Sequence, residues 1–283
     1  MTTFSAISSF PELFTPRPRD SHKGTFGTLG IIGGATGMSG AVVLAATAAI
    51  YTGCGKVWAG FNQATLPMPI IPNRPEIMLA CASQLLLRND ITTWVAGCGL
   101  GLSESSAEIL KCIMARAHNT PLLLDADAIT LLDQHKDLSR LAKAHPHLIL
   151  TPHPKEASRL LRNDTATVQA NREIAVRQIA QTYQATVVLK GQHSLVCAYP
   201  NTETIYINHS GNPGLSTAGS GDVLSGIIGA LLAQGISTWQ AVCGGVWLHG
   251  AAADYLAKKQ GEKGMLAGEL PEVARYIRNI TQV

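Results

Sequence analysis

The chain has 283 residues, of which 46% are hydrophobic and 14% charged, and its formal net charge is +3. This length accommodates one large α/β domain with a substantial core, and the composition excludes disorder as the overall state. Lysine and arginine form no runs, which argues against a nucleic-acid or membrane surface as partner and leaves room for a small anionic ligand.

The cysteines and the N-terminus indicate the compartment. Six cysteines lie singly in apolar or glycine-rich stretches without a Cys-x-x-Cys pair, which is typical of reduced thiols and gives no sign of disulfides or structural zinc. Residues 1–20 lack the features of a secretory signal or transit peptide, and no apolar block reaches the roughly 18 residues that span a bilayer. We expect a cytoplasmic protein with a single domain over residues 1–283, in which residues 1–20 form a poorly structured N-terminal segment.

Short β-rich runs alternate with longer helical patterns, which indicates a mostly parallel sheet covered by helices on both faces. The predicted strands are 29–32, 57–59, 94–96, 122–124, 148–150 and 187–189, with a terminal hairpin from 195–197 to 204–207. The predicted helices are 40–51, 105–118, 155–161, 167–183, 223–233, 238–257 and 271–280. Small residues in two of them can pack inside the fold or between subunits, and we expect a homo-oligomer.

Glycines and polar residues follow the predicted strands, where open α/β sheets bind ligands beyond the strand carboxyl ends. These residues are Gly33, Gly34, Gly97, Gly99, Gly101, Asp125, Asp127, His153 and Lys190. Asp125 and Asp127 alternate at a strand end, so only one of them can easily face the site, and the other is expected to cap the next helix.

The sharpest motif is the run Asn-Pro-Gly-Leu-Ser-Thr-Ala-Gly-Ser-Gly-Asp at residues 212–222, directly before an apolar helix. Small residues allow the backbone N–H groups of Gly219, Ser220 and Gly221 to turn inward, and the helix N-terminus adds partial positive charge. This arrangement predicts a site for a transferring phosphoryl group, with Asp222 as the general base for a substrate hydroxyl. An acidic residue in a first turn can also simply favour the helix start, but the small residues before Asp222 favour the phosphoryl site.

Residues 212–222 resemble the signature of ribokinase-like enzymes, and more closely that of the ADP/ATP-dependent NAD(P)H-hydrate dehydratases. Further segments match that family in the same order, namely 22–27 with 33–34 and 39–41, then 97–101, 124–128 and 150–156. The resemblance covers roughly residues 21–257 and implies a ribokinase-like three-layer fold. Cys98 stands where the family usually has proline, a departure that removes no polar group.

The resemblance also implies binding roles for individual residues. Those implied for the hydrated substrate are Ala41, Gly99, His153, Asn212 and Asp222, and those for the adenine nucleotide are Lys190, Gly191, Gln192, His193, Ser194 and Gly221. Glu156 would belong to the acidic group near Mg²⁺, through water. From the residues alone, Ala41 could equally reflect tight packing, His153 could cap nearby backbone, and Lys190 could be a solvated lysine beside a turn.

The resemblance implies that the chain restores (6S)-NAD(P)H hydrate to NAD(P)H, with ADP or ATP as co-substrate and Mg²⁺ as cofactor. Hydroxide is a poor leaving group and phosphate a good one, so phosphorylation of the ring hydroxyl followed by elimination of phosphate restores the double bond. Many bacterial members carry an N-terminal epimerase domain, for which there is no room before His22, so we expect cooperation with a separate epimerase.

Three alternatives differ from this hypothesis. A kinase of the same fold that acts on a vitamin precursor, such as hydroxyethylthiazole or hydroxymethylpyrimidine, would release a stable phosphorylated product. A dinucleotide-dependent oxidoreductase requires a Gly-x-Gly-x-x-Gly pattern that residues 30–37 do not meet. A nucleotide sensor or scaffold would keep the fold without the activity, and an assay separates it from an enzyme.

Overall fold

The computed structural model describes residues 3–280 and is built on a nine-stranded sheet in the order β3-β2-β1-β4-β5-β6-β7-β8-β9. Strands β1–β7 run parallel, β8 is antiparallel to β7, and β9 is antiparallel to β8. Their bounds are β1 Thr28–Gly33, β2 Lys56–Phe61, β3 Met78–Cys81, β4 Thr93–Ala96, β5 Leu122–Leu124, β6 Leu148–Leu150, β7 Thr186–Leu189, β8 Leu195–Ala198 and β9 Ile205–Ile207. The predicted α/β class with a mostly parallel sheet is confirmed.

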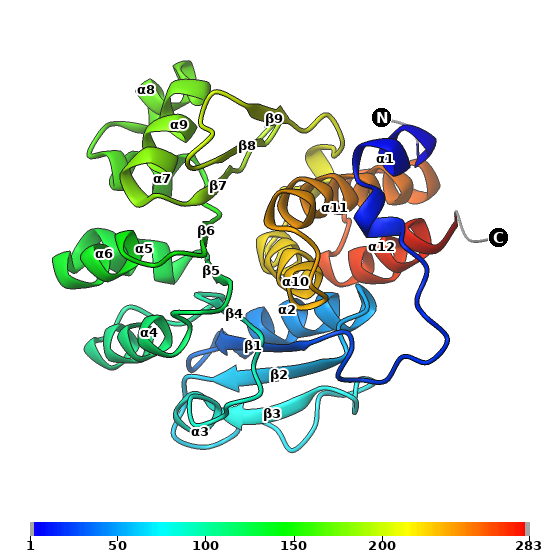
Figure 1. Cartoon of the computed structure of the whole chain (residues 1–283), viewed down its shortest axis with the longest axis horizontal. Coiled ribbons are helices and arrows are strands. Elements are labelled where there is room, and N and C mark those ends of the chain that lie inside the picture. The colour runs from blue at the N-terminus through cyan, green and yellow to red at the C-terminus, as the bar shows by residue number, and fades with distance from the viewer. Residues whose placement is uncertain (1–2, 281–283) are drawn as a thin grey trace.

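Helices cover both faces of the sheet (Figure 1). One face carries α2 (Ser39–Tyr51), α10 (Ser220–Ala233) and α11 (Thr238–Gln260), with α12 (Leu270–Asn279) and α1 (Thr3–Ser9) packed outside them. The other face carries α3 (Ala82–Leu85), α4 (Glu104–Arg116), α5 (Asp127–Gln134), α6 (Lys136–Lys143), α7 (Pro154–Leu161), α8 (Thr165–Ala170) and α9 (Arg172–Tyr183). None of the helices among residues 3–280 combines the length and the hydrophobicity that crossing a bilayer requires.

The direction of strand addition reverses between β1 and β4. The chain adds β2 and β3 on one side of β1 and then returns to place β4 on its other side. The loops that follow β1 and β4 are tied together, because the backbone N–H of Gly34 donates to Cys98 O (2.9 Å) and that of Ala35 to Gly99 O (2.7 Å). Such a switch point leaves a crevice beyond the strand carboxyl ends.

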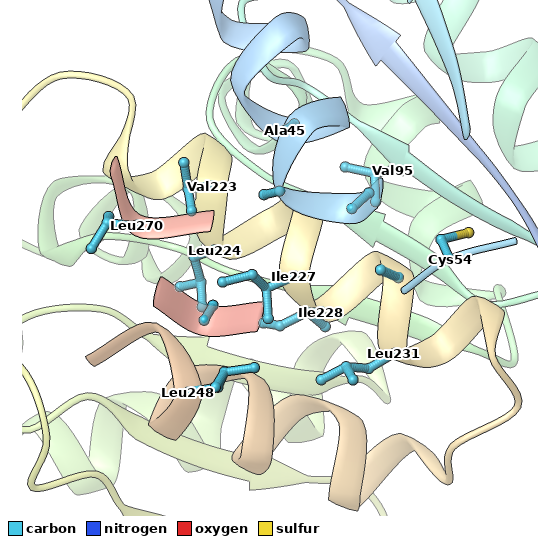
Figure 2. Close-up of a cluster of buried hydrophobic side chains, with 14 of the residues drawn as sticks. Ala45, Cys54, Val95, Val223, Leu224, Ile227, Ile228, Leu231, Leu248 and Leu270 are labelled. Carbon is cyan, nitrogen blue, oxygen red and sulfur yellow. The ribbon is translucent and has the colours of Figure 1, made fainter. Parts of the chain in front are cut away.

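Helix α10 is the central helix of its face. Val223, Leu224, Ile227, Ile228 and Leu231 are all buried, and Figure 2 shows them between Ala45, Val95, Leu248 and Leu270 from the surrounding elements. Helix α10 approaches α2 very closely at Gly226, where an added Cβ would lie only 2.1 Å from Ala45 O. The helix can therefore occupy this position only with glycine at 226.

Several elements differ from the sequence prediction. The short strand β3 and the helices α3, α5 and α6 were not predicted, because short elements give little periodicity to recognise. The single helix expected over 167–183 is broken at Asn171 (φ −133°, ψ 49°), which separates α8 from α9. The helix expected from residue 223 begins three residues earlier, at Ser220.

The expectation that residues 1–20 are poorly structured is wrong for residues 3–14. They form α1 and a 3₁₀ turn (Pro11–Phe14), whereas residues 1 and 2 lie outside the described residues. The Phe10 ring packs 5.6 Å from that of Tyr206 and 6.2 Å from that of Trp247, and Leu13 is buried against Gly244. Burial of these apolar side chains against α11 holds the segment, and it cannot be read from the segment itself.

The close approach at Gly226 leads to a stability prediction. Gly226→Ala should lower the free energy of unfolding by about 1–3 kcal/mol, because the added methyl group overpacks the contact between α2 and α10. Chemical denaturation followed by circular dichroism would measure the change. Gly40→Ala is the matched control, since Gly40 is also helical but has nothing within 4 Å of an added Cβ; an equal loss in the two variants would contradict this role for Gly226.

Candidate active site

The first turn of α10 lies at the crevice edge of the sheet and exposes backbone donors. Gly219 precedes the helix in a left-handed conformation (φ +91°), which glycine adopts without strain. The first N–H groups of a helix have no intrahelical acceptor, and those of Gly221 and Asp222 have no acceptor elsewhere among residues 3–280. An anion placed at this turn would meet two donors and the positive end of the helix.

A buried cluster of charged and polar groups joins this turn to the strand ends. Lys190 follows β7, and its Nζ lies 2.6 Å from Asp125 Oδ1 at the end of β5. The second oxygen of Asp125, Oδ2, accepts from the Ser225 hydroxyl of α10 at 2.8 Å. A Cβ added to Gly221 would lie 3.6 Å from Lys190 Nζ, so the ammonium group stands directly beside the helix N-terminus.

Charge interactions in this cluster keep Lys190 positively charged. Burial alone lowers the pKa of the Lys190 ammonium, but the Asp125 and Glu156 carboxylates beside it raise that pKa above its ordinary value. A cation fixed at this position would complement the charge of a phosphate bound at the helix start.

Asp222 stands in the first turn of α10 and forms no ion pair with any cation of residues 3–280. Burial raises the pKa of Asp222 to about 6, and the nearby Asp125 carboxylate adds to the shift, while a hydrogen bond from the Cys98 thiol and the charge of Lys190 oppose it. Burial also raises the pKa of Cys98, so the thiol keeps its proton. A carboxyl group that titrates near neutral pH is well suited to accept a proton.

His153 and Glu156 form a reciprocal cap at the start of α7. His153 Nδ1 accepts from the backbone N–H groups of Lys155 (3.1 Å) and Glu156 (3.2 Å), and the backbone N–H of His153 donates to Glu156 Oε2 (2.8 Å). His153 Nε2 lies 3.2 Å from Glu156 Oε1. Both ring nitrogens of His153 thus interact with other groups of the protein. This is the alternative role of His153, capping of nearby backbone. The contact of His153 with substrate stays a prediction.

The structure brings Ala41 and Gly99 together. Gly99 has a left-handed conformation (φ +61°), and a Cβ added there would lie 3.2 Å from Ala41 Cβ and 2.7 Å from Met38 Cβ. The loop after β4 therefore packs against the start of α2 at the switch point. This proximity is compatible with either role of Ala41, tight packing or contact with substrate, because both would use the same surface.

Two other residues of the signature use their side chains inside the loop. The Asn212 amide donates to Asp254 Oδ1 of α11 (3.0 Å) and accepts from the Gly214 N–H (3.0 Å). The Ser220 hydroxyl donates to Leu215 O (2.8 Å). These bonds shape residues 211–220 and use one donor and one acceptor of the Asn212 amide, which leaves its second N–H and second lone pair for the predicted substrate contact.

The predicted nucleotide loop, residues 190–194, is held by Arg172 at the start of α9. Its guanidinium donates to Leu189 O (3.1 Å), Lys190 O (3.4 Å) and His193 O (3.4 Å). A Cβ on Gly191 would lie 2.5 Å from Arg172 Nη1, so the arginine packs directly on the loop. Sequence reasoning missed Arg172, because no local signal connects a helix start with a loop 18 residues later.

The structure also separates the two aspartates that follow β5. Asp125 is buried and faces Lys190, whereas Asp127 Oδ2 accepts from the Gly101 N–H (2.8 Å) and holds the loop after β4. The expected helix cap is not observed within residues 3–280, where the hydrogen bond of the Asp127 carboxylate goes to the Gly101 N–H and not to the backbone of α5. Ser225 and Cys98 were likewise not assigned to the site from the sequence, since neither residue type signals contact with a carboxylate.

Comparison with protein families and curated proteins gives consistent matches. The sequence model of a family described as NAD(P)H-hydrate dehydratase matches residues 29–275. The ADP-dependent (S)-NAD(P)H-hydrate dehydratase of Neisseria meningitidis is 56% identical over 271 residues, covering 95% of this chain and 91% of that protein. The bifunctional NAD(P)H-hydrate repair enzyme Nnr of Escherichia coli is 38% identical over 93% of this chain and 50% of its own length, so this chain spans about half of that bifunctional relative.

Solved structures show the same architecture. The ADP/ATP-dependent NAD(P)H-hydrate dehydratase from Bacillus subtilis, co-crystallised with ATP/Mg²⁺, matches with a TM-score of 0.82 and 28% identity over 98% of this chain and 96% of that one. The hydroxyethylthiazole kinase from Pyrococcus horikoshii matches with a TM-score of 0.66 and 14% identity over 98% of this chain and 94% of that one. At this low identity the kinase comparison establishes the ribokinase-like fold alone.

The environment of Asp222 predicts a pH-dependent stability difference. Because the pKa of Asp222 is raised from 3.8 to about 6, the folded state binds this proton more tightly than the unfolded state. The resulting stabilisation is present below the unfolded pKa and is lost as pH rises through about 6. Asp222→Asn removes the buried charge and should therefore be more stable than the wild type at about pH 8, by up to about 3 kcal/mol, with the difference vanishing towards about pH 4.

Urea denaturation at several pH values would test this difference, and the exposed Asp20→Asn controls for the loss of one negative charge. A wild type more stable than Asp222→Asn at about pH 8 would contradict the described environment of the carboxyl group.

Proposed function

The chain belongs to the NAD(P)H-hydrate dehydratase family, and we propose that its phosphoryl transfer takes place at the first turn of α10. The chain is an ADP-dependent (S)-NAD(P)H-hydrate dehydratase, a hydro-lyase that repairs nicotinamide nucleotides. One observation carries the proposed location: the free N–H groups of Gly221 and Asp222, the Lys190 ammonium and the Asp222 carboxyl meet at one helix start.

The chemistry proposed for this turn follows from its charges. Asp222 removes the proton from the substrate hydroxyl as it attacks the terminal phosphorus, and a pKa near 6 leaves the carboxyl mostly ionised at neutral pH. The free N–H groups of Gly221 and Asp222 and the helix N-terminus stabilise the transferring phosphoryl group, whereas the Ser220 N–H, also expected to contribute, donates to Thr217 O at 3.4 Å. Transfer of the terminal phosphoryl group of ADP to the hydroxyl releases AMP. The ring nitrogen of the phosphorylated intermediate then expels phosphate, and loss of a proton from the adjacent ring carbon restores the double bond.

We assign the nucleotide to residues 190–194 and to Gly221. Lys190 lies beside the turn that receives the phosphoryl group, and Arg172 fixes the loop that follows it. Ala41 and Gly99, which meet at the switch point, are proposed to contact the hydrated ring together with His153, Asn212 and Asp222.

The residues present are compatible with Mg²⁺ held mainly by the nucleotide. No group of three or more metal-binding side chains occurs within residues 3–280, but Mg²⁺ commonly uses one or two carboxylates together with phosphates and water. Burial raises the pKa of Glu156 to about 7, against the charge of Lys190, so this carboxyl lacks full compensation and would be stabilised by a nearby cation. We propose Glu156 as a ligand through water, and the ion would neutralise phosphate charge when bound.

We also propose that the protein forms one domain over residues 1–283, lies in the cytoplasm and cooperates with a separate epimerase. All six cysteines are free thiols, which supports a reducing compartment. The exposed side chains of Tyr276 on α12 and of Ile280 directly after it support packing against a second copy in a homo-oligomer.

Loss of the Asp222 carboxylate should abolish the reaction. Asp222→Asn is expected to lower kcat by about 10²- to 10⁴-fold, because proton removal from the hydroxyl is lost while the fold is kept. The measurement is ADP-dependent appearance of NADH from its hydrate, with Asp20→Asn as control.

In the wild type, the rate should fall as pH drops below about 6, since protonation neutralises Asp222. Turnover near that of the wild type in Asp222→Asn would remove Asp222 from the mechanism, and a stable phosphorylated product would indicate a kinase instead.

Arg172 should affect nucleotide binding more than chemistry. Arg172→Ala is expected to raise the KM for ADP about tenfold with a smaller change in kcat, because the loop at 190–194 loses its charged hydrogen bonds. Arg172→Lys should restore part of the loss. Arg177→Ala is the matched control, because Arg177 lies on the same helix and donates to Thr202 O in a different loop; an equal rise in both variants would argue against a specific role for Arg172.

A further inference from the structure

A second concave site lies away from the crevice, where the ends of several helices meet. A pocket of about 480 Å³ opens between α5, α6, α7 and α9. Its floor includes the buried Tyr183, whose hydroxyl lies 3.3 Å from the Ser139 hydroxyl. Five cations surround this floor, namely Lys136, Arg140, Lys143, Arg159 and Arg162.

The positive charge is concentrated in this pocket. Asp133 is the single carboxylate that lines it, so its walls carry a formal charge of +4, whereas the whole chain carries +3. The rest of the protein is therefore close to neutral, and the excess of cations is a local feature.

The cations of the pocket have no carboxylate partners. Within residues 3–280, none of the five forms an ion pair. Arg159 donates to the Thr130 hydroxyl at 3.4 Å, and Lys143 Nζ lies 5.3 Å from the centre of the Tyr183 ring. Elsewhere on the surface, cations such as Lys56 and Arg88 share a carboxylate, Asp90.

Helix dipoles offset only part of this charge. Helices α5, α6, α7 and α9 end at Gln134, Lys143, Leu161 and Tyr183, beside the pocket. Each helix C-terminus carries about half a negative charge, so four of them offset about −2. An excess of about +2 remains, which is close in magnitude to the charge of about −2 on one phosphate group.

The donors also suit phosphate oxygens. The guanidinium groups of Arg140, Arg159 and Arg162 offer paired N–H donors in a fixed fork, and the hydroxyls of Ser139 and Tyr183 add neutral donors. A volume of about 480 Å³ is typical of sites for small molecules.

We infer that this pocket binds a small polyanion that carries a phosphate or pyrophosphate group, at a site separate from the candidate active site. The two sites lie at opposite ends of α7, which starts after His153 and ends just before Arg162. Arg159 and Glu156 lie about one helical turn apart on α7, but none of the residues that line the pocket belongs to the candidate active site.

Calorimetric titration with inorganic pyrophosphate at low salt tests this inference. The wild type should bind pyrophosphate at this pocket. In Arg140→Ser/Lys143→Ser this binding should be lost or weakened about tenfold or more, because two charged donors are missing. Lys258→Ser/Lys259→Ser is the matched control and should keep this binding. It removes the same charge from the last turn of α11, where Lys259 also lies over a tyrosine ring, just as Arg140 and Lys143 occupy the last turn of α6.

Further measurements separate the possible outcomes. Turnover of NAD(P)H hydrate should be unchanged in Arg140→Ser/Lys143→Ser, so a failure of this inference is distinguishable from a failure of the proposed function. If the pocket binds ADP more tightly than pyrophosphate, its ligand is a nucleotide, and if it binds pyrophosphate more tightly, its ligand is free pyrophosphate. Both results support the site. Equal binding of pyrophosphate to the wild type and to Arg140→Ser/Lys143→Ser would overturn it, as would binding of a glutamate-rich peptide without binding of pyrophosphate.

Discussion

The contact between α2 and α10 at Gly226 is the constraint on which the rest of the site depends. Because Gly226 lacks a side chain, the helix lies against the backbone of Ala45 and above the sheet, with Gly229 against Val95 of β4. The first turn of α10 is thereby held at the crevice beyond the strand ends. A helix displaced by even one methyl group would move its N-terminal N–H groups away from Lys190 and Asp125.

At this turn, the structure holds more negative than positive charge in a poorly solvated place. Asp125, Glu156 and Asp222 surround the single ammonium group of Lys190, and burial raises the pKa of Asp222 and of Glu156 towards neutrality. Asp125 is satisfied by Lys190 and Ser225. Glu156 is held by His153, and Asp222 accepts a hydrogen bond from the Cys98 thiol, so neither carboxyl has a buried cation as its hydrogen-bond partner among residues 3–280. This difference from Asp125 underlies the roles proposed for them, proton removal at Asp222 and support of a cation at Glu156.

Several groups act by holding loops and not by touching a ligand. Arg172 fixes the loop after β7, Asp127 fixes the loop after β4, and Asp254 fixes the turn at Gly211. Each of them binds backbone atoms of a segment distant in the sequence. The crevice is thus assembled from loops whose positions are set by buried or half-buried polar contacts, which are strong because water competes poorly for them.

The sequence by itself determined the α/β class, most strand positions and the helix that follows the small-residue run at 212–222, because strand patterns and small-residue motifs are local properties of the chain. Tertiary structure decided which side chains meet. It placed Asp125 and not Asp127 on Lys190, gave His153 a helix to cap, and brought Cys98, Ser225 and Arg172 into the site. It also ordered residues 3–14 by burying Phe10 and Leu13. These outcomes depend on packing between distant segments, and no local pattern of residues encodes the distance between them.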